Sequence, residues 1–128
     1  SHRQKESCKQ KSLSGESKTM KIRRSRFNLD IVVCEITDKN CPPAIIEGLD
    51  SPGLGFAIWG EGIDTPIVVI DNRVGLTENH LLAIEAHEVG HIMTKSTEEY
   101  DAELFAIALL RTTEYHEAAD LLLGRGIV

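Results

Sequence analysis

The sequence predicts one α+β domain in which a small twisted sheet packs against helices. In the first half, apolar residues fall in short β-branched runs separated by glycine and proline, which is typical of strands. In the second half they recur at helical spacing. A chain of 128 residues, 41% hydrophobic and 27% charged, suits a globular protein with a single core.

Charge divides the chain near residue 26. Residues 1–26 hold nine Lys or Arg against two Glu, a local charge of +7. Residues 27–128 hold five Lys or Arg against eighteen Asp or Glu, a local charge of −13. We therefore predict a flexible basic extension over 1–26 and a folded domain over 27–128. The acidic domain argues against nucleic-acid binding, which only the basic extension could support.

The sequence shows no sign of membrane association. No apolar run approaches the roughly 20 residues of a membrane-spanning helix. The N-terminus also lacks the apolar core of a signal peptide, so we expect a cytoplasmic protein. The oligomeric state is left open.

Three segments predict strands. FNLDIVVCEI (27–36) is dense in β-branched residues, and FAIW (56–59) forms a short apolar run within a glycine-rich stretch. TPIVVIDN (65–72) is the clearest strand, a continuous apolar run that ends in Asp-Asn. AIIEGL (44–49) could be either a helical turn or an extended segment.

A first helix is predicted over residues 78–94. Thr77 can cap its N-terminus, and Glu78 in the first turn favours the positive end of the helix dipole. Gly90 lies inside this helix, where glycine costs about 1 kcal/mol relative to alanine. We therefore expect another element to approach the backbone closely at Gly90.

Two further helices follow. Ser96 and Glu99 fit a capping box, which predicts a second helix from there through about Arg111. EYHEAADLLLG (114–124) predicts a third, shorter helix. Strands followed by helices complete the α+β prediction.

The motif HEVGH (87–91) predicts a zinc site on the first helix. His87 and His91 are four residues apart, so both imidazoles project from one face at a spacing that suits one zinc ion. Glu88 lies about 100° round the helix, where it can reach a water molecule at the metal without being a ligand. The alternative is an amphipathic helix with two hydrogen-bonded histidines, which would bury polar groups at a cost of several kcal/mol.

A third ligand must come from another element, because catalytic zinc usually has three protein ligands and one open position. We favour Asp101, which begins an apolar row that should face the first helix. Glu103 is the second choice and His116 the third. Glu98 and Glu99 are expected to be capping residues and residues that interact with the helix dipole.

With PIVVIDN before it and DAELFAIALL after it, HEVGH resembles the small zinc metallopeptidases of the ImmA/IrrE type, which are gluzincin-like zincins. The resemblance covers about residues 65–111. It implies a minimal zincin-like domain, one zinc ion held by His87, His91 and Asp101, and Glu88 as general base. It also implies hydrolysis of a protein or peptide substrate. Where the family has glutamate, this chain has the shorter Asp101, so the second helix would have to approach more closely, and Glu103 stays an alternative.

Two classes of function remain open at this stage. The leading hypothesis is a zinc-dependent peptidase, and the alternative is a non-catalytic zinc-binding module that regulates or binds a partner. Glu88 separates them, because a structural zinc ion needs no base. Peptide deformylase, another HExxH enzyme, fits poorly, because EGID (61–64) lacks the cysteine ligand that its EGC motif provides.

Other parts of the site are less defined by sequence. GFAIWGEG (55–62) could form an edge strand against which an extended substrate pairs, or a hairpin that packs Trp59 into the core. Tyr100, Tyr115 and His116 are candidate donors to an oxyanion.

Overall fold

The computed structural model describes residues 20–38 and 55–124. In this part of the chain, four strands precede three helices: β1 (Met20–Arg24), β2 (Val32–Ile36), β3 (Gly55–Ile58), β4 (Ile67–Asp71), α3 (Glu78–Thr94), α4 (Glu99–Thr112) and α5 (His116–Leu123). The predicted α+β class is confirmed. The flexibility expected of residues 1–19 and the ambiguous segment 44–49 lie outside the described residues.

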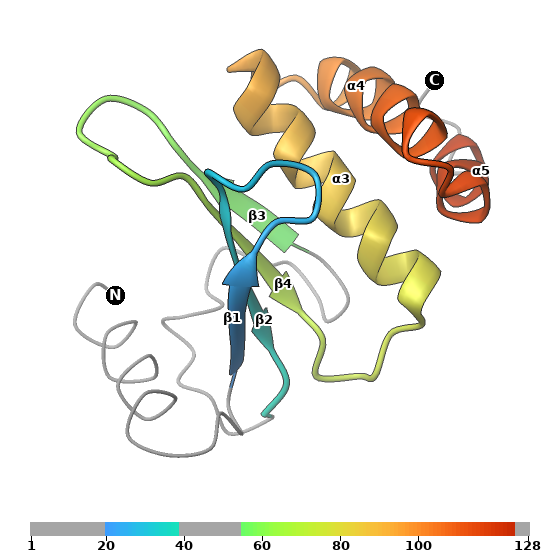
Figure 1. Cartoon of the computed structure of the whole chain (residues 1–128), viewed down its shortest axis with the longest axis horizontal. Helices are drawn as coiled ribbons and strands as arrows, with labels where there is room; N and C mark the ends of the chain where they lie inside the picture. Colours follow the sequence, from blue (N-terminus) through green and yellow to red (C-terminus); the bar gives the residue numbers. More distant parts are fainter. Residues whose placement is uncertain (1–19, 39–54, 125–128) are drawn as a thin grey trace.

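The strands form one mixed sheet in the order β1-β2-β4-β3 (Figure 1). β2 and β4 pair in parallel, whereas β1 pairs antiparallel with β2 and β3 pairs antiparallel with β4. β3 therefore stands at one end of the sheet order, and it lies beside α3. This arrangement places a sheet edge next to the helix that carries the HEVGH motif.

β1 lies inside the segment predicted to be a flexible extension. Its Arg23 donates a hydrogen bond of 2.6 Å to Glu85 of α3, whose other oxygen accepts 2.7 Å from Ser25 Oγ. The Glu85 side chain is 1% exposed, so these bonds compensate a buried carboxylate. The predicted boundary at residue 26 is thus corrected. Residues 20–26 belong to the folded body, because its acidic residues neutralise their basic charge.

The strand predicted over 27–36 begins only at Val32. Before it, the chain turns, with Ile31 N–H donating to Asn28 O at 3.0 Å and Asp30 N–H to the Asn28 side chain at 2.9 Å. An asparagine that bonds the backbone two residues on favours a turn over a strand. The other two predicted strands are confirmed as β3 and β4 with slightly different ends.

α3 has the predicted bounds, and Thr77 Oγ1 accepts a hydrogen bond from His80 N–H at its N-terminus. The helix lies between the sheet and the α4–α5 pair (Figure 1). One core joins α3 to the sheet: Ile31, Val33, Val68, Ile70, Val89 and Ile92. A second joins it to α4 and α5: Leu82, Ala83, Ala86, Ala106, Leu110, Ala118, Ala119 and Leu122. None of the helices described is long and apolar enough to cross a membrane.

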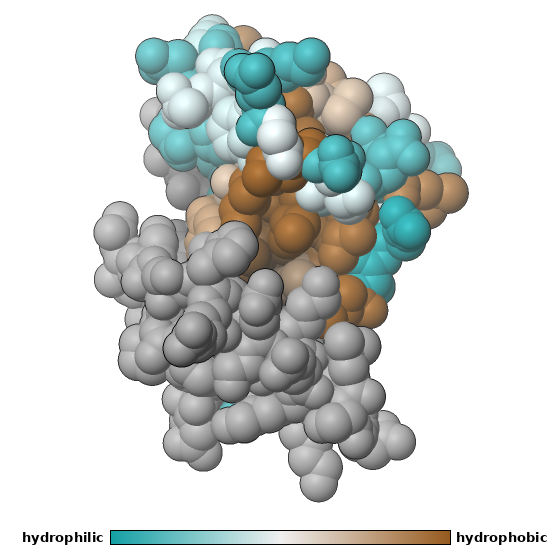
Figure 2. Space-filling model, turned by 90° about the vertical axis from the view of Figure 1, so that its left-hand side faces the viewer, coloured by the Kyte–Doolittle hydropathy of each residue, from teal (hydrophilic) through white to brown (hydrophobic). Residues whose placement is uncertain are grey.

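The sheet also carries apolar side chains on its face away from α3. Ile36 and Val69 are buried there, with Cys34, Phe56 and Ile67 packed against them. A hydrophobic band is visible on this side of the molecule (Figure 2). β4 lies between β2 and β3 and carries apolar residues on both faces, which fits its continuous apolar run before Asp71, whereas Glu35 interrupts the run in β2.

The turn from β4 into α3 is fixed by Asp71 and Asn72. Buried Asp71 accepts two hydrogen bonds of 2.7 Å from the Arg73 guanidinium. These hydrogen bonds raise the pKa of Arg73 above its ordinary value, so its guanidinium stays charged. Asn72 accepts from Leu76 N–H at 2.5 Å and donates to Glu35 at 3.3 Å. The Asp-Asn end of the predicted strand therefore sets where α3 begins.

Gly90 lies at the contact between α3 and α4, as its position inside a helix predicted. A Cβ added to Gly90 would lie 2.5 Å from the carbonyl oxygen of Ala102. No side chain fits at that distance, so the two helix backbones pack directly against each other.

Replacing Gly90 with alanine should destabilise the fold. The added Cβ would meet backbone atoms of Ala102, so the steric cost of overpacking should lie near the upper end of about 1–3 kcal/mol. Less the gain in helix propensity of about 1 kcal/mol, we expect a net loss of about 2 kcal/mol. Urea unfolding measures it. Gly124→Ala is the matched control, because its added Cβ would meet no described atom closer than 3.4 Å. Equal stability of wild type and Gly90→Ala would contradict this account of the contact.

Candidate metal centre

The HEVGH motif lies on the buried C-terminal half of α3. His87, Glu88 and His91 are 5%, 7% and 7% exposed. The i, i+4 spacing brings the rings of His87 and His91 to 4.8 Å between centroids, nearly perpendicular to each other. Their Nε2 atoms are 3.2 Å apart. The two nitrogens thus converge on one point, as the motif predicted.

The other ring nitrogens hold both imidazoles in place. His91 Nδ1 lies 2.7 Å from the carbonyl oxygen of Ser96. A carbonyl can only accept, so Nδ1 carries a proton, and in the neutral ring Nε2 is then the atom that can bind a metal. His87 Nδ1 bonds the buried carboxylate of Glu103 in the same way. Both Nε2 atoms therefore face inward in the state that binds a metal.

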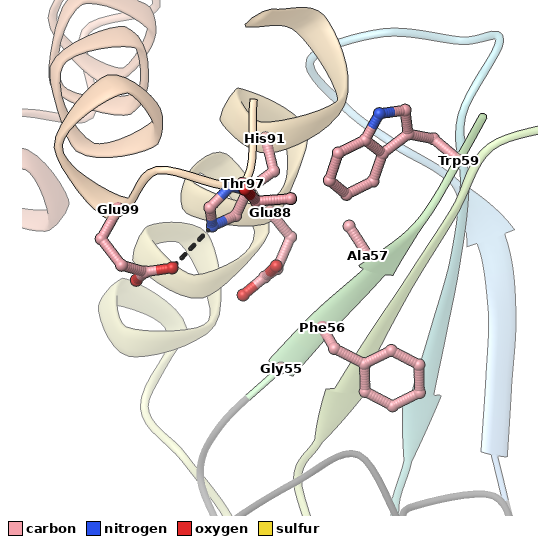
Figure 3. A pocket seen from close by; sticks show the side chains of 8 residues that line it. All are labelled: Gly55, Phe56, Ala57, Trp59, Glu88, His91, Thr97 and Glu99. Carbon is pink, nitrogen blue, oxygen red and sulfur yellow. Dashed lines mark hydrogen bonds and ion pairs between the residues drawn. The ribbon is translucent and has the colours of Figure 1, made fainter. Parts of the chain in front are cut away.

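Glu99, at the start of α4, completes the group. One of its carboxylate oxygens lies 3.0 Å from His87 Nε2, and the other lies 2.9 Å from His91 Nε2. The contact with His91 is visible in Figure 3. His87, His91 and Glu99 offer ligand atoms that all lie within 4.8 Å of one another. The Glu99 side chain is 61% exposed and forms the part of this group that faces solvent.

The donor set fits a divalent cation such as zinc. Two ligands about 2.0–2.1 Å from a tetrahedral ion lie about 3.3 Å apart, close to the 3.2 Å between the two Nε2 atoms. A positive charge among the two Nε2 atoms and the carboxylate stabilises them at these distances, and a divalent cation would supply it. The Glu103 oxygen that does not bond His87 is buried without a hydrogen-bond partner. A positive charge on the far side of the His87 ring would also stabilise the negative charge of this carboxylate.

Asp101, the predicted third ligand, does not lie with the histidines. It is exposed, and its carboxylate accepts a hydrogen bond of 2.7 Å from Ser96 Oγ. Glu103, the second choice, contacts the outer nitrogen of His87 instead of the converging atoms. His116 begins α5 and contacts Arg111. The structure therefore brings Glu99 to the site in place of all three candidates.

The difference arises at the start of α4. The predicted capping box required the Glu99 side chain to turn back to Ser96, but α4 begins at Glu99 with Glu98 as N-cap and no side-chain cap. With this start, the face of α4 toward α3 carries Glu99 and Glu103, which are one turn apart. Asp101 lies about 200° round the helix from Glu99. The signal was present in the sequence: two glutamates four residues apart, like the two histidines.

A cavity of about 240 Å³ opens beside this group (Figure 3). Its lining residues come from β3 and the residue after it, from α3, and from the start of α4: Gly55, Phe56, Ala57, Trp59, Glu88, His91, Thr97 and Glu99. The Glu88 carboxylate points into the cavity near Glu99. The lining does not include the oxyanion donors suggested by sequence, Tyr100, Tyr115 and His116.

Trp59 follows β3 directly and stacks on His91. The two ring centroids are 6.2 Å apart and the ring planes differ by 13°. The sequence suggested only a strand edge or a core residue for this tryptophan. Its contact with a candidate ligand could not be inferred, because the two residues are far apart in the chain.

Comparisons of the chain with family models, with curated proteins and with solved structures find no match.

Replacing Glu99 with alanine should abolish or strongly weaken zinc binding, because it removes both oxygens that face the imidazoles. Asp101→Ala, two residues along the same helix, is the matched control and should bind zinc like wild type. Isothermal titration of each purified variant with Zn²⁺ measures both. Loss of binding in Asp101→Ala with full binding in Glu99→Ala would restore the original assignment.

Proposed function

We propose that this chain is a zinc-dependent peptidase with His87, His91 and Glu99 as metal ligands and Glu88 as general base. The observation that carries the proposal is the convergence of both Nε2 atoms on the Glu99 carboxylate, with each Nδ1 committed to a hydrogen-bond partner. A His₂Glu ligand set that leaves one position open is typical of catalytic zinc in peptidases. The resemblance of HEVGH to ImmA/IrrE-type metallopeptidases favours the same activity.

Glu88 has the position that hydrolysis requires. When bound, zinc acts as a Lewis acid that polarises a carbonyl and lowers the pKa of a water molecule toward about 7. Glu88 neighbours the first ligand, is 7% exposed and points into the cavity. Its carboxylate can accept a proton from the attacking water and return it to the leaving amine. His87 and His91 take no part in this proton transfer, because each Nδ1–H is held in a hydrogen bond, that of His87 to Glu103 and that of His91 to the Ser96 carbonyl.

The site is better suited to a peptide than to a small ligand. The cavity of about 240 Å³ is below the range of about 300–1,000 Å³ that is typical of small-molecule sites. β3 borders it, and no described strand pairs with the outer edge of β3. An extended peptide can form backbone hydrogen bonds along such an edge while one part of it enters the cavity. We therefore propose an extended protein segment as the substrate.

A non-catalytic zinc-binding module is the competing proposal. It accounts for the ligands equally well, but it gives no role to a buried carboxylate that points into the cavity beside them. A carboxylate in that position has a direct role in hydrolysis, so Glu88 favours the enzyme.

Replacing Glu88 with glutamine should leave zinc binding intact and lower the rate of peptide hydrolysis by at least about 100-fold, the usual contribution of a general base. The assay uses zinc-loaded protein and a mixture of unstructured peptides, with products identified by mass spectrometry. Glu98→Gln, which removes an exposed glutamate at the N-cap of α4, should retain activity. If zinc-loaded wild type binds one equivalent of metal but cleaves no peptide, the non-catalytic module is correct.

A further inference from the structure

The imidazole of His91 is contacted on three sides. Its Nδ1 edge bonds the Ser96 carbonyl at 2.7 Å, and the ring of His87 meets it almost perpendicularly. Its face lies against the indole of Trp59. The first two contacts come from α3 and the residues that follow it, whereas Trp59 comes from the sheet side. Trp59 is therefore a contact between the sheet and a candidate metal ligand.

The surroundings of Trp59 differ from those of an ordinary core residue. It is only partly buried, and it forms one wall of the cavity (Figure 3). Phe56, three residues earlier, gives a direct comparison, because it packs against the cluster of Ile36 and Val69 on the other face of the sheet. Figure 3 shows this ring directed away from His91 and Glu88. Of these two aromatic residues, only Trp59 stacks on a histidine.

We propose that Trp59 is a positioning residue of the metal centre: it holds the His91 ring and strengthens metal binding through its indole face. This inference rests on the proposed metal site. Binding of a cation at Nε2 withdraws electron density from the imidazole, and the electron-rich indole face attracts an electron-poor ring more strongly than a neutral one. The contact should thus stabilise the metal-bound form relative to the metal-free form.

Aromatic character, and not volume alone, should matter at this position. Trp59→Phe keeps an aromatic face beside His91, whereas Trp59→Leu keeps an apolar side chain without one. From the strength of cation–π contacts, we expect Trp59→Leu to bind Zn²⁺ about 3- to 30-fold more weakly than wild type. Trp59→Phe should recover most of this loss, because phenylalanine retains a weaker version of the same interaction.

The experiment is competition for Zn²⁺ between each protein and a chromogenic chelator, with the unfolding of each metal-free variant measured in parallel. Phe56→Leu is the control: it removes a nearby aromatic ring that is directed away from His91 and Glu88, so its stability should fall while its Zn²⁺ affinity stays unchanged. A Trp59→Leu variant that binds Zn²⁺ as tightly as wild type would overturn the inference. Equal losses in Trp59→Leu and Phe56→Leu would do the same.

A spectroscopic readout tests the contact without mutating Trp59. The chain has a single tryptophan, so its intrinsic emission reports on this position alone. Co²⁺ can replace zinc at nitrogen and carboxylate sites, and its bound form should quench Trp59 emission in a saturable way with one equivalent. His91→Ala should abolish saturable quenching. If wild type binds one Co²⁺ with no change in emission, the inference fails while the metal site stands; if wild type binds no metal, the proposed function fails as well.

Discussion

The close contact between α3 and α4 at Gly90 is the constraint on which the candidate site depends. The space for a Cβ at Gly90 is taken by the backbone of Ala102, so the two helices approach more closely than side chains would allow. Ala83, Ala86 and Ala106 extend the contact between the two helices, together with the larger Leu82 and Leu110. At this separation the short side chain of a glutamate on α4 reaches an imidazole on α3. A larger residue at the contact would move Glu99 and Glu103 away together, because both belong to one rigid helix.

Buried carboxylates join α3 to its neighbours on two sides. Glu85 receives hydrogen bonds from Arg23 of β1 and from Ser25 directly after it, and Glu103 of α4 bonds His87. A carboxylate without a partner is costly inside a protein, so each bond fixes the rotation of α3 as well as its position. Because both carboxylates are buried and bonded to other elements, the orientation of the HEVGH face depends on the whole fold and not on α3 alone.

Much of this structure could be predicted from the sequence, and the failures have identifiable causes. The bounds of α3, the clustering of His87 and His91 and the close approach at Gly90 follow from local spacing. The residue proposed as third ligand does not follow from local spacing. Whether Asp101 or Glu99 faces the histidines depends on the rotation of α4 about its axis, and that rotation depends on which residue caps the helix. The contact between Trp59 and His91 could not be predicted either, because it depends on the order of the strands in the sheet. Local sequence pattern predicts which residues share one face of a helix. Tertiary packing determines which residues of other elements contact that face.

The connection between α3 and α4 also restricts how this chain can vary. Ser96 N–H donates to the carbonyl oxygen of His91, and the Ser96 carbonyl in turn accepts from the His91 ring. Lys95 adopts a left-handed backbone conformation (φ 54°), which lets the chain reverse within a few residues. One inserted residue here would turn α4 by about 100° relative to α3 and direct a different side chain at the histidines. Related chains that keep this site should therefore differ in the composition of the connection but share its length.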